Sequence, residues 1–526
     1  MIREPGAFRQ EGPGPHHKFN HRAGRALRSK FERPRAESFG IRAAGFAASR
    51  GRPQSFTPGP EDSKGKGKDR TMSSDLIEKA LKTAVETKDI VFGDGVTSQT
   101  GEMFAKLFPG AKALVVADEN TFGATGEEVV ASLKAAGVEF AQEPYIFPGK
   151  PTLYGDYKNV EILRKHIEPL EDTVVCSIGA GTLNDIAKLA SGELGRPYMN
   201  VCTAASVDGF AAFGASISRD GFKITRSCPG PAGLVADNDV VCNAPKRLTA
   251  TGYGDLIEKI PAGADWILAD ALGIEPINEY VWNMVQGPLR GSLADPEAIG
   301  NGDKKAIEGL MEGNLMSGLA MQAGQSSRSA SGAGHQFSHV WEMEGHGLDW
   351  EPPLSHGFKV GVGTVASCAI WEEFLKMEVE DFDVDRALAA VKSPEQVESQ
   401  VRAALKPRMQ EEAVRHSLKK RTEGEELVAR IELLKEKWPE LRERLRAQLM
   451  APEEIMDRLK TVGAPYHPEL IEIDWDRFRE THFKAQMIRD RYTVFDILID
   501  LGVYDAVVEK LFSPEGFWGR HRRPAE

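Results

Sequence analysis

The sequence lacks any run of about 18 or more apolar residues, which excludes a membrane-spanning helix. It also lacks the apolar stretch of roughly 7–15 residues near the start that a secretory signal needs. Cysteine is scarce, because the 526 residues include five, with no CxxC pair. An odd, widely spaced set of this kind indicates free thiols in a reducing compartment rather than disulfides or structural zinc. We therefore expect a cytoplasmic protein.

Length and charge divide the chain. At 526 residues it is too long for one hydrophobic core and is expected to form two or three domains. Basic residues outnumber acidic ones in residues 1–71, although the whole chain has a net charge of -12. This first segment is rich in Gly, Pro, Arg and Ser and has no periodicity, so it predicts a disordered basic extension or an over-extended start. Targeting and nucleic-acid binding are weaker interpretations of it, and we expect no nucleic-acid partner.

Residues 72–242 alternate short apolar runs with helical stretches. Runs such as 113–117 and 173–178 suit buried parallel strands, and a helical stretch such as 160–168 lies between two of them. The alternation predicts a doubly wound α/β domain. After residue 243 the strand signal largely disappears, and residues 243–526 are expected to form an all-helical domain.

A glycine-rich segment follows the expected strand at 173–178. Gly179, Ala180, Gly181, Thr182 and Leu183 let the backbone turn tightly before the next helix begins. This geometry directs free backbone N–H groups at an anion, such as the pyrophosphate of a dinucleotide. The third glycine of the usual dinucleotide fingerprint is missing, so a plain tight turn remains an alternative.

Two other expected strands end in polar residues. Thr203, Ser206 and Asp208 follow the run 198–202, and ligands of open α/β sheets bind at the carboxyl ends of strands. Asp208 suits a substrate hydroxyl, with a simple Asp-Gly turn as the alternative. Asp118 also ends a strand and suits ribose hydroxyls, which would favour NAD over NADP. Strand ends, however, often carry Asp for turn geometry alone.

Histidines are concentrated in one short stretch, where four of the chain's twelve fall between residues 335 and 356. His335 and His339 are four residues apart, so on a helix they share a face and can converge on one ion. Asp255 lies upstream in a Gly-Tyr-Gly-Asp segment, and His356 lies downstream. This pattern suggests a metal site built across several helices, although ordinary core or surface histidines are the alternative for an isolated pair.

Together these segments resemble the sn-glycerol-1-phosphate dehydrogenases, above all their bacterial branch. That family falls within the larger group of iron-containing alcohol dehydrogenases, glycerol dehydrogenases and 3-dehydroquinate synthases. The likeness covers roughly residues 75–510. Its motifs follow one another in the family's order: Gly179-Ala180-Gly181-Thr182-Leu183-Asn184-Asp185, Thr203-Ala204-Ala205-Ser206-x-Asp208-Gly209, Gly252-x-Gly254-Asp255, Gly334-His335-x3-His339, His356-Gly357-x-Lys359 and Arg489-Asp490-Arg491-Tyr492-Thr493.

The resemblance implies reduction of dihydroxyacetone phosphate, a small phosphorylated triose, to sn-glycerol 1-phosphate by NADH or NADPH, and the reverse reaction. It also implies a homodimer, one divalent metal (nickel or zinc) and a place in phospholipid synthesis. The matching positions are Asp255, His335 and His356 as metal ligands, Asp208 and His339 as catalytic residues that contact the substrate, 179–183 as the pyrophosphate loop, and Thr203 and Ser206 as a second cofactor contact.

Several points stay open at this stage. The substrate phosphate needs cations, and proximity to the motifs suggests Lys223, Arg226, Lys246, Arg247 and Lys359. A glycerol or other polyol dehydrogenase would keep the metal ligands but need no phosphate pocket. A 3-dehydroquinate synthase-like lyase and a non-enzymatic metal-binding scaffold are further alternatives.

Overall fold

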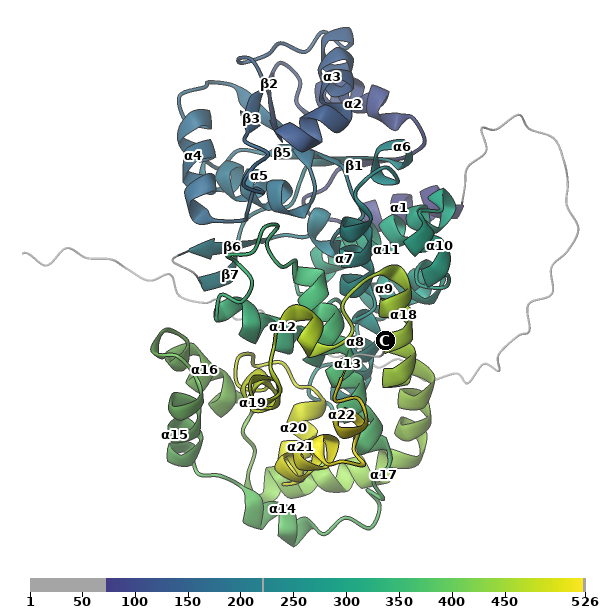
Figure 1. The fold of residues 1–526 in the computed structure, drawn as a ribbon, viewed down its shortest axis with the longest axis vertical. Coiled ribbons are helices and arrows are strands. Elements are labelled where there is room, and N and C mark those ends of the chain that lie inside the picture. The colour runs from purple at the N-terminus through teal and green to yellow at the C-terminus, as the bar shows by residue number, and fades with distance from the viewer. Residues whose placement is uncertain (1–71, 220–221, 524–526) are drawn as a thin grey trace, which may run out of the picture. The chain divides into compact units, whose positions relative to one another are not determined.

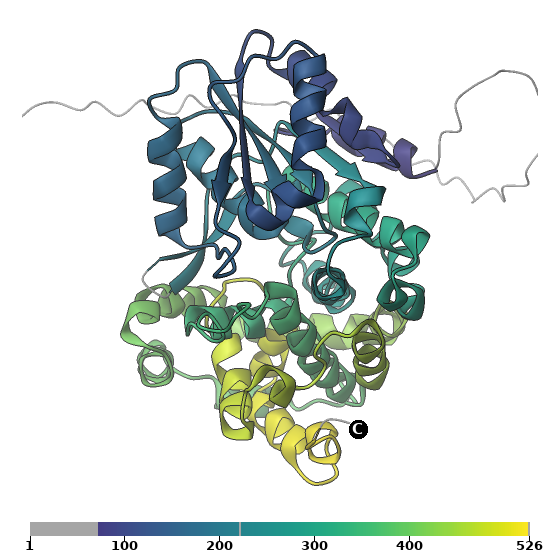
Figure 2. The same ribbon diagram turned by 45° about the horizontal axis from the view of Figure 1, so that its top comes forward.

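The computed structural model describes residues 72–219 and 222–523. The basic extension predicted for residues 1–71 lies outside the described residues. Figures 1 and 2 show the described chain from two directions, with the strands in its blue-to-teal part and helices alone in its green-to-yellow part. This arrangement confirms the predicted fold class, a parallel α/β part followed by a helical part.

The described residues include a six-stranded parallel sheet in the order β1-β8-β5-β4-β2-β3. A separate antiparallel pair is formed by β6 and β7. The strands are β1 (Asp89–Gly93), β2 (Lys112–Asp118), β3 (Tyr145–Phe147), β4 (Thr173–Gly179), β5 (Tyr198–Cys202), β6 (Ala215–Arg219), β7 (Phe222–Arg226) and β8 (Gly233–Asp237). The helices of this part are α1 (Met72–Leu81), α2 (Thr100–Leu107), α3 (Glu119–Ala135), α4 (Tyr157–Ile167), α5 (Gly181–Glu193) and α6 (Asn238–Val241), with the 3-10 turns η1 (Val96–Gln99) and η2 (Asp208–Phe210).

The central strands are apolar on both faces because helices cover both faces. Every residue of β4 is buried. Leu114 and Val116 of β2 pack in one hydrophobic cluster with α4 and α5, whereas Ala113 and Val115 pack in another with α2 and α3. Alternate side chains of a strand point to opposite faces, so the continuous apolar run follows from this two-sided burial.

The remaining described chain is helical. Its elements are α7 (Lys246–Leu256), α8 (Lys259–Ala271), α9 (Glu279–Ser292), α10 (Pro296–Asn301), α11 (Lys304–Gly324), α12 (Ala333–Met343), α13 (His356–Leu375), α14 (Val384–Ala390), α15 (Pro394–Ala404), α16 (Pro407–Lys420), α17 (Gly424–Gln448), α18 (Pro452–Val462), η3 (Pro468–Ile471), α19 (Trp475–Ala485), α20 (Val494–Asp500), α21 (Tyr504–Phe512) and α22 (Phe517–Arg520). Along α17, the buried side chains recur every three or four residues, as an amphipathic helix requires. The boundary at residues 242 and 243 stays a prediction. None of the described helices is both long and apolar enough to cross a membrane.

Three helices of this part, α7, α12 and α13, approach one another closely. A Cβ on Gly357 of α13 would lie 1.9 Å from the carbonyl oxygen of Thr251 of α7. A Cβ on Gly363, further along α13, would lie 2.3 Å from the carbonyl oxygen of Gly334 of α12. Larger residues at either position would push the helix backbones apart, so glycine is required for this packing.

Candidate active site

The structure brings together the three residues predicted as metal ligands. Asp255 ends α7, His335 lies in the first turn of α12, and His356 begins α13. One ligand atom from each lies within 4.8 Å of the other two. Asp255 and His335 are buried and His356 is half-buried, so an ion bound here would keep one side open toward a ligand. One carboxylate and two imidazoles form a donor set that suits a catalytic divalent metal.

Each histidine of this cluster is held by a buried glutamate. Nδ1 of His335 lies 2.7 Å from a carboxylate oxygen of Glu258, and Nδ1 of His356 lies 2.9 Å from Oε1 of Glu342. Burial would lower the pKa of His335, but the charges of Glu258 and Asp255 outweigh burial and raise that pKa to about 9. Both rings therefore turn Nδ1 toward a carboxylate and leave Nε2 for the cluster.

Lys259 balances the acidic side of the site. Its ammonium group is fully buried and lies 2.9 Å from Oδ2 of Asp208 and 3.1 Å from Oδ1 of Asp255. Burial would raise the pKa of Asp255, yet Lys259 and the neighbouring histidines hold it well below its usual range. In contrast, burial and the charge of Asp255 raise the pKa of Asp208 despite Lys259. Asp208 is held further by the hydroxyl of Ser317, which donates to its Oδ2 at 2.9 Å.

His339 lies beside the cluster, one helical turn after His335. Its ring centroid is 5.9 Å from those of both His335 and His356. Its Nδ1 lies 3.2 Å from Oε2 of Glu342. Burial lowers the pKa of His339 to about 3, so the ring is neutral at physiological pH. The two members of the His-x3-His pair thus share a helix face but differ in charge.

A cavity of about 200 Å³ joins this cluster to the glycine-rich loop. Ala180, Gly181 and Thr182 line it on the α/β side, and His356 lines it on the helical side. No side chain caps the start of α5, so its first N–H groups stay available for an anion. Ser206 also lines the cavity, and its buried Oγ forms no hydrogen bond among the described residues.

Four other predicted cofactor residues do not line this cavity. Gly179 and Leu183 pack on each other behind the loop, where a Cβ on Gly179 would lie 2.6 Å from that of Leu183. Thr203 is buried, and its N–H donates to the carbonyl oxygen of Gly179. Asp118 caps α3, because one of its carboxylate oxygens accepts from two backbone N–H groups of the first turn. The proposed contact of Asp118 with ribose stays a prediction.

The predicted phosphate cations differ in their surroundings. Arg247 lines the cavity and donates to the carbonyl oxygen of Pro353 at 2.8 Å. Lys359 is buried on α13, whereas Lys246 is exposed. The guanidinium of Arg226 lies 4.9 Å from the centre of the Tyr157 ring, outside the cavity lining. The side chain of Lys223 lies outside the described residues.

Sequence reasoning missed the charged residues that support this site. Glu258 and Lys259 follow Asp255 by three and four positions, in the turn after α7 and at the start of α8. Glu342 follows His339 by three positions on α12. Charged residues this close in the sequence to a predicted site residue were a usable signal.

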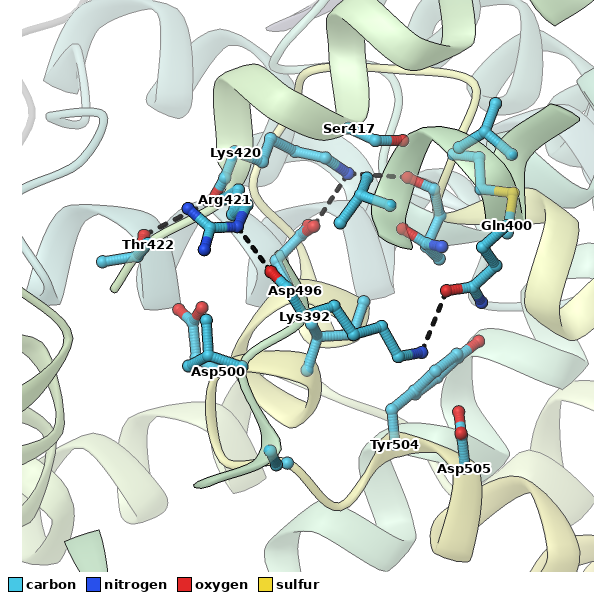
Figure 3. A pocket seen from close by; sticks show the side chains of 18 of the residues that line it. Lys392, Gln400, Ser417, Lys420, Arg421, Thr422, Asp496, Asp500, Tyr504 and Asp505 are labelled. Carbon is cyan, nitrogen blue, oxygen red and sulfur yellow. Dashed lines mark hydrogen bonds and ion pairs between the residues drawn. The ribbon is translucent and has the colours of Figure 1, made fainter. Parts of the chain in front are cut away.

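A second cavity of about 200 Å³ lies between α16, α17, α20 and α21 and contains none of the predicted site residues (Figure 3). Two of its charged side chains are already paired. Nζ of Lys420 lies 2.7 Å from Asp496, and Arg421 bonds to Glu423 at 2.6 Å. We therefore place the candidate active site at the first cavity.

The fold is that of the iron-containing alcohol dehydrogenase class. Residues 91–245 match the family model described as iron-containing alcohol dehydrogenase. Two solved structures share the fold at low sequence identity. A probable glycerol dehydrogenase from Sinorhizobium meliloti 1021 is 17% identical with a TM-score of 0.50, covering 80% of this chain and 98% of its own. Glycerol dehydrogenase from Schizosaccharomyces pombe is 16% identical with a TM-score of 0.50, covering 82% and 92%.

Curated relatives point to one family within this class. A glycerol-1-phosphate dehydrogenase [NAD(P)+] from Halalkalibacterium halodurans is 35% identical over 51% of this chain and 67% of its own length. One from Bacillus velezensis is 33% identical over 57% and 74%. An archaeal relative of the same name, from Pyrococcus furiosus, is 32% identical over 53% and 77%. The chain belongs to the glycerol-1-phosphate dehydrogenase [NAD(P)+] family of oxidoreductases.

Proposed function

We propose that this chain interconverts dihydroxyacetone phosphate and sn-glycerol 1-phosphate by hydride transfer with NAD(H) or NADP(H). The observation that carries the proposal is the juxtaposition of two sites. The carboxylate–imidazole cluster of Asp255, His335 and His356 adjoins a cavity that begins at the uncapped end of α5. The names of the curated relatives support the same substrate pair.

Asp255, His335 and His356 would hold one divalent cation. The O/N/N donor set fits zinc or nickel, the two metals that we propose, and also fits iron and cobalt. A cation here supplies Lewis-acid stabilisation of the negative charge that develops on the carbonyl oxygen during hydride addition.

The chain's own residues bind and orient the reactants. The first N–H groups of α5 hold the cofactor pyrophosphate, and the Ser206 hydroxyl gains a partner in the cofactor. Asp208, fixed by Lys259 and Ser317, positions a substrate hydroxyl. His339, beside the cluster, contacts the substrate. Asp118 remains our candidate for the ribose hydroxyls, and its capping bonds use one of its two oxygens.

Arg489 is our leading candidate for the substrate phosphate. It follows α19, and its side chain is exposed. Among the residues that the structure describes, Arg489 forms no hydrogen bond or ion pair. Its charge nevertheless acts on the active site, since after burial it is a further cause of the lowered pKa of His339, and it interacts with Glu342. A guanidinium without a partner beside the substrate residues suits bidentate binding of a phosphate.

Steady-state kinetics test the proposal. We expect reduction of dihydroxyacetone phosphate with NADH or NADPH, loss of turnover after chelation, and recovery with zinc or nickel. Arg489→Gln removes a charged hydrogen-bonding group, so it raises the KM for sn-glycerol 1-phosphate about 10- to 100-fold and leaves the KM for the cofactor unchanged. The matched control is Arg444→Gln, at an exposed arginine on α17, which changes neither value. Equal efficiency with glycerol and glycerol 1-phosphate would instead identify a glycerol dehydrogenase.

A cytoplasmic homodimer remains part of the proposal. The five cysteines are free thiols, and four of them are buried, which supports a reducing compartment. Sedimentation analysis of the purified chain measures the oligomeric state directly.

A further inference from the structure

Glu342 of α12 contacts two rings with different proposed roles. Its side chain is almost fully buried, with the residue 1% exposed. Oε1 lies 2.9 Å from Nδ1 of His356, a proposed metal ligand, and Oε2 lies 3.2 Å from Nδ1 of His339, a proposed substrate contact. The two rings are stacked, with 22° between their planes and 5.9 Å between their centroids.

The chemistry of a carboxylate fixes the tautomer of both rings. An ionised carboxylate only accepts hydrogen bonds, so each Nδ1 that faces it carries a hydrogen. A neutral imidazole with its hydrogen on Nδ1 has a lone pair on Nε2. His356 therefore offers Nε2 as a ligand atom, and His339 offers Nε2 as an acceptor.

We propose that Glu342 is a positioning residue that couples metal binding to substrate recognition through the tautomers of His356 and His339. The inference rests on the proposed function, because it assigns the two rings to metal and substrate. It also specifies what His339 does. With its hydrogen on Nδ1, His339 accepts a hydrogen bond from a hydroxyl group of a polyol phosphate at Nε2, and it is not the proton donor to the reduced carbonyl.

Glu258 provides a matched comparison. It is as buried as Glu342 and lies 2.7 Å from Nδ1 of His335, the other imidazole of the cluster. It has no contact with His339 among the interactions of the described residues. Glu258 therefore acts on the metal side alone, whereas Glu342 acts on metal and substrate.

The isosteric variant Glu342→Gln separates the two rings. A glutamine side chain has one accepting oxygen, so the two Nδ1–H groups compete for it and the carboxamide holds neither ring as firmly as the carboxylate does. We expect a 10- to 100-fold loss of zinc affinity, in the range of other residues that support metal ligands. We also expect a higher KM for dihydroxyacetone phosphate at saturating zinc. Glu258→Gln gives the loss of zinc affinity with the KM within about twofold of the wild type.

Zinc affinity is measured by competition with a chromophoric chelator on the full chain without substrate. A double-mutant cycle of Glu342→Gln with His339→Ala then tests the substrate side. If Glu342 acts through His339, the two effects on KM are not additive. Histidine ¹⁵N spectra report the Nδ1–H tautomer of His339 directly, and thermal melting identifies a variant that fails to fold.

Two results overturn the inference. One is zinc affinity of Glu342→Gln within twofold of the wild type, and the other is an additive effect on KM in the cycle. The zinc titration and the ¹⁵N spectra need no substrate. A chain that is inactive on dihydroxyacetone phosphate would contradict the proposed function. The zinc titration and the ¹⁵N spectra would still test the role of Glu342 separately.

Discussion

The two sides of the cavity offer different kinds of groups to a charged ligand. On the α/β side, the lining residues Ala180, Gly181, Thr182 and Ser206 carry no charge, and the anion site is the start of α5. The charged lining residue on this side, Asp185, lies 3.4 Å from Lys188. On the helical side, the cluster is surrounded by buried charges, and these charges occur in contacting pairs such as Lys259 with Asp255 and His335 with Glu258.

The difference follows from the cost of burial. Partial charges on backbone N–H groups need no counter-ion, whereas each full charge removed from water costs several kcal/mol unless a partner offsets it. On the helical side, loss of a single charged partner should therefore have a large effect. On the α/β side, the main effect should come from side-chain volume added to the loop.

The largest expected effect comes from removing the buried cation. Lys259→Met leaves Asp208 and Asp255 buried without their ammonium partner, so we expect the free energy of unfolding of the metal-free chain to fall by about 3–5 kcal/mol. Urea unfolding measures this change.

The matched control for Lys259 is Lys304. It pairs with Asp94 and Asp239 but is 42% exposed, so Lys304→Met should lower the free energy of unfolding far less than Lys259→Met. Equal losses in the two variants would show that burial does not govern these pairs.

A smaller effect is expected from added volume on the α/β side. A Cβ on Gly181 would lie 2.5 Å from Cγ1 of Val207, so Gly181→Val displaces the loop from the cofactor. We predict a 10- to 100-fold rise in the KM for NADH, equivalent to about 1.4–2.7 kcal/mol, with zinc content unchanged. Gly123→Ala is the control, because nothing lies within 4 Å of its added Cβ. Loss of zinc from Gly181→Val would contradict the separation of the two sides.

The smallest expected effect comes from His482, a buried ring of the helical part that burial keeps neutral. The His482 ring packs against Phe337, Phe478 and Phe512, and burial lowers its pKa to about 4. The unfolded ring titrates near pH 6.5, so as pH falls below 6.5 the unfolded state takes up a proton that the folded state refuses. The contribution of the neutral His482 ring to the free energy of unfolding is fully present above about pH 6.5 and is lost on acidification toward pH 4.

By pH 5.5 this proton uptake by the unfolded state lowers the free energy of unfolding by about 1 kcal/mol. His482→Gln removes the titrating ring, so its melting temperature should decline less between pH 7 and pH 5.5 than that of the wild type. Parallel declines in the two proteins would exclude His482 as a source of acid sensitivity.

Contiguous patterns in the sequence predicted the fold class, whereas the grouping of Asp255, His335 and His356 as ligands came from the resemblance to a family. The strand, the loop at 179–183 and the following helix are adjacent in the chain, so their geometry is local. The support for the site is not local, because Glu258 meets His335 from the turn between α7 and α8, 77 positions away. Strand-end residues such as Asp118 are ambiguous in principle, since a helix cap and a ribose contact use the same carboxylate.

Two other residues show the same limit. His346 had no assignable role in the sequence, and the structure gives it a structural one. Its Nε2 lies 2.6 Å from the carbonyl oxygen of Ile471, and its Nδ1 lies 2.9 Å from Arg477. Arg489 begins the motif Arg489-Asp490-Arg491-Tyr492-Thr493 but was not among the phosphate candidates, because this motif is far along the chain from those that contain the predicted metal ligands.

The glycines between α7, α12 and α13 bear on how metal preference evolves. Ligand spacing in this cluster is set by how closely three helix backbones approach, and Gly357 and Gly363 permit that approach. Ions of different radius need slightly different spacing. A lineage that adapts to another metal can therefore keep all three ligands and change residues at the helix crossings, where substitutions move whole helices by fractions of an ångström.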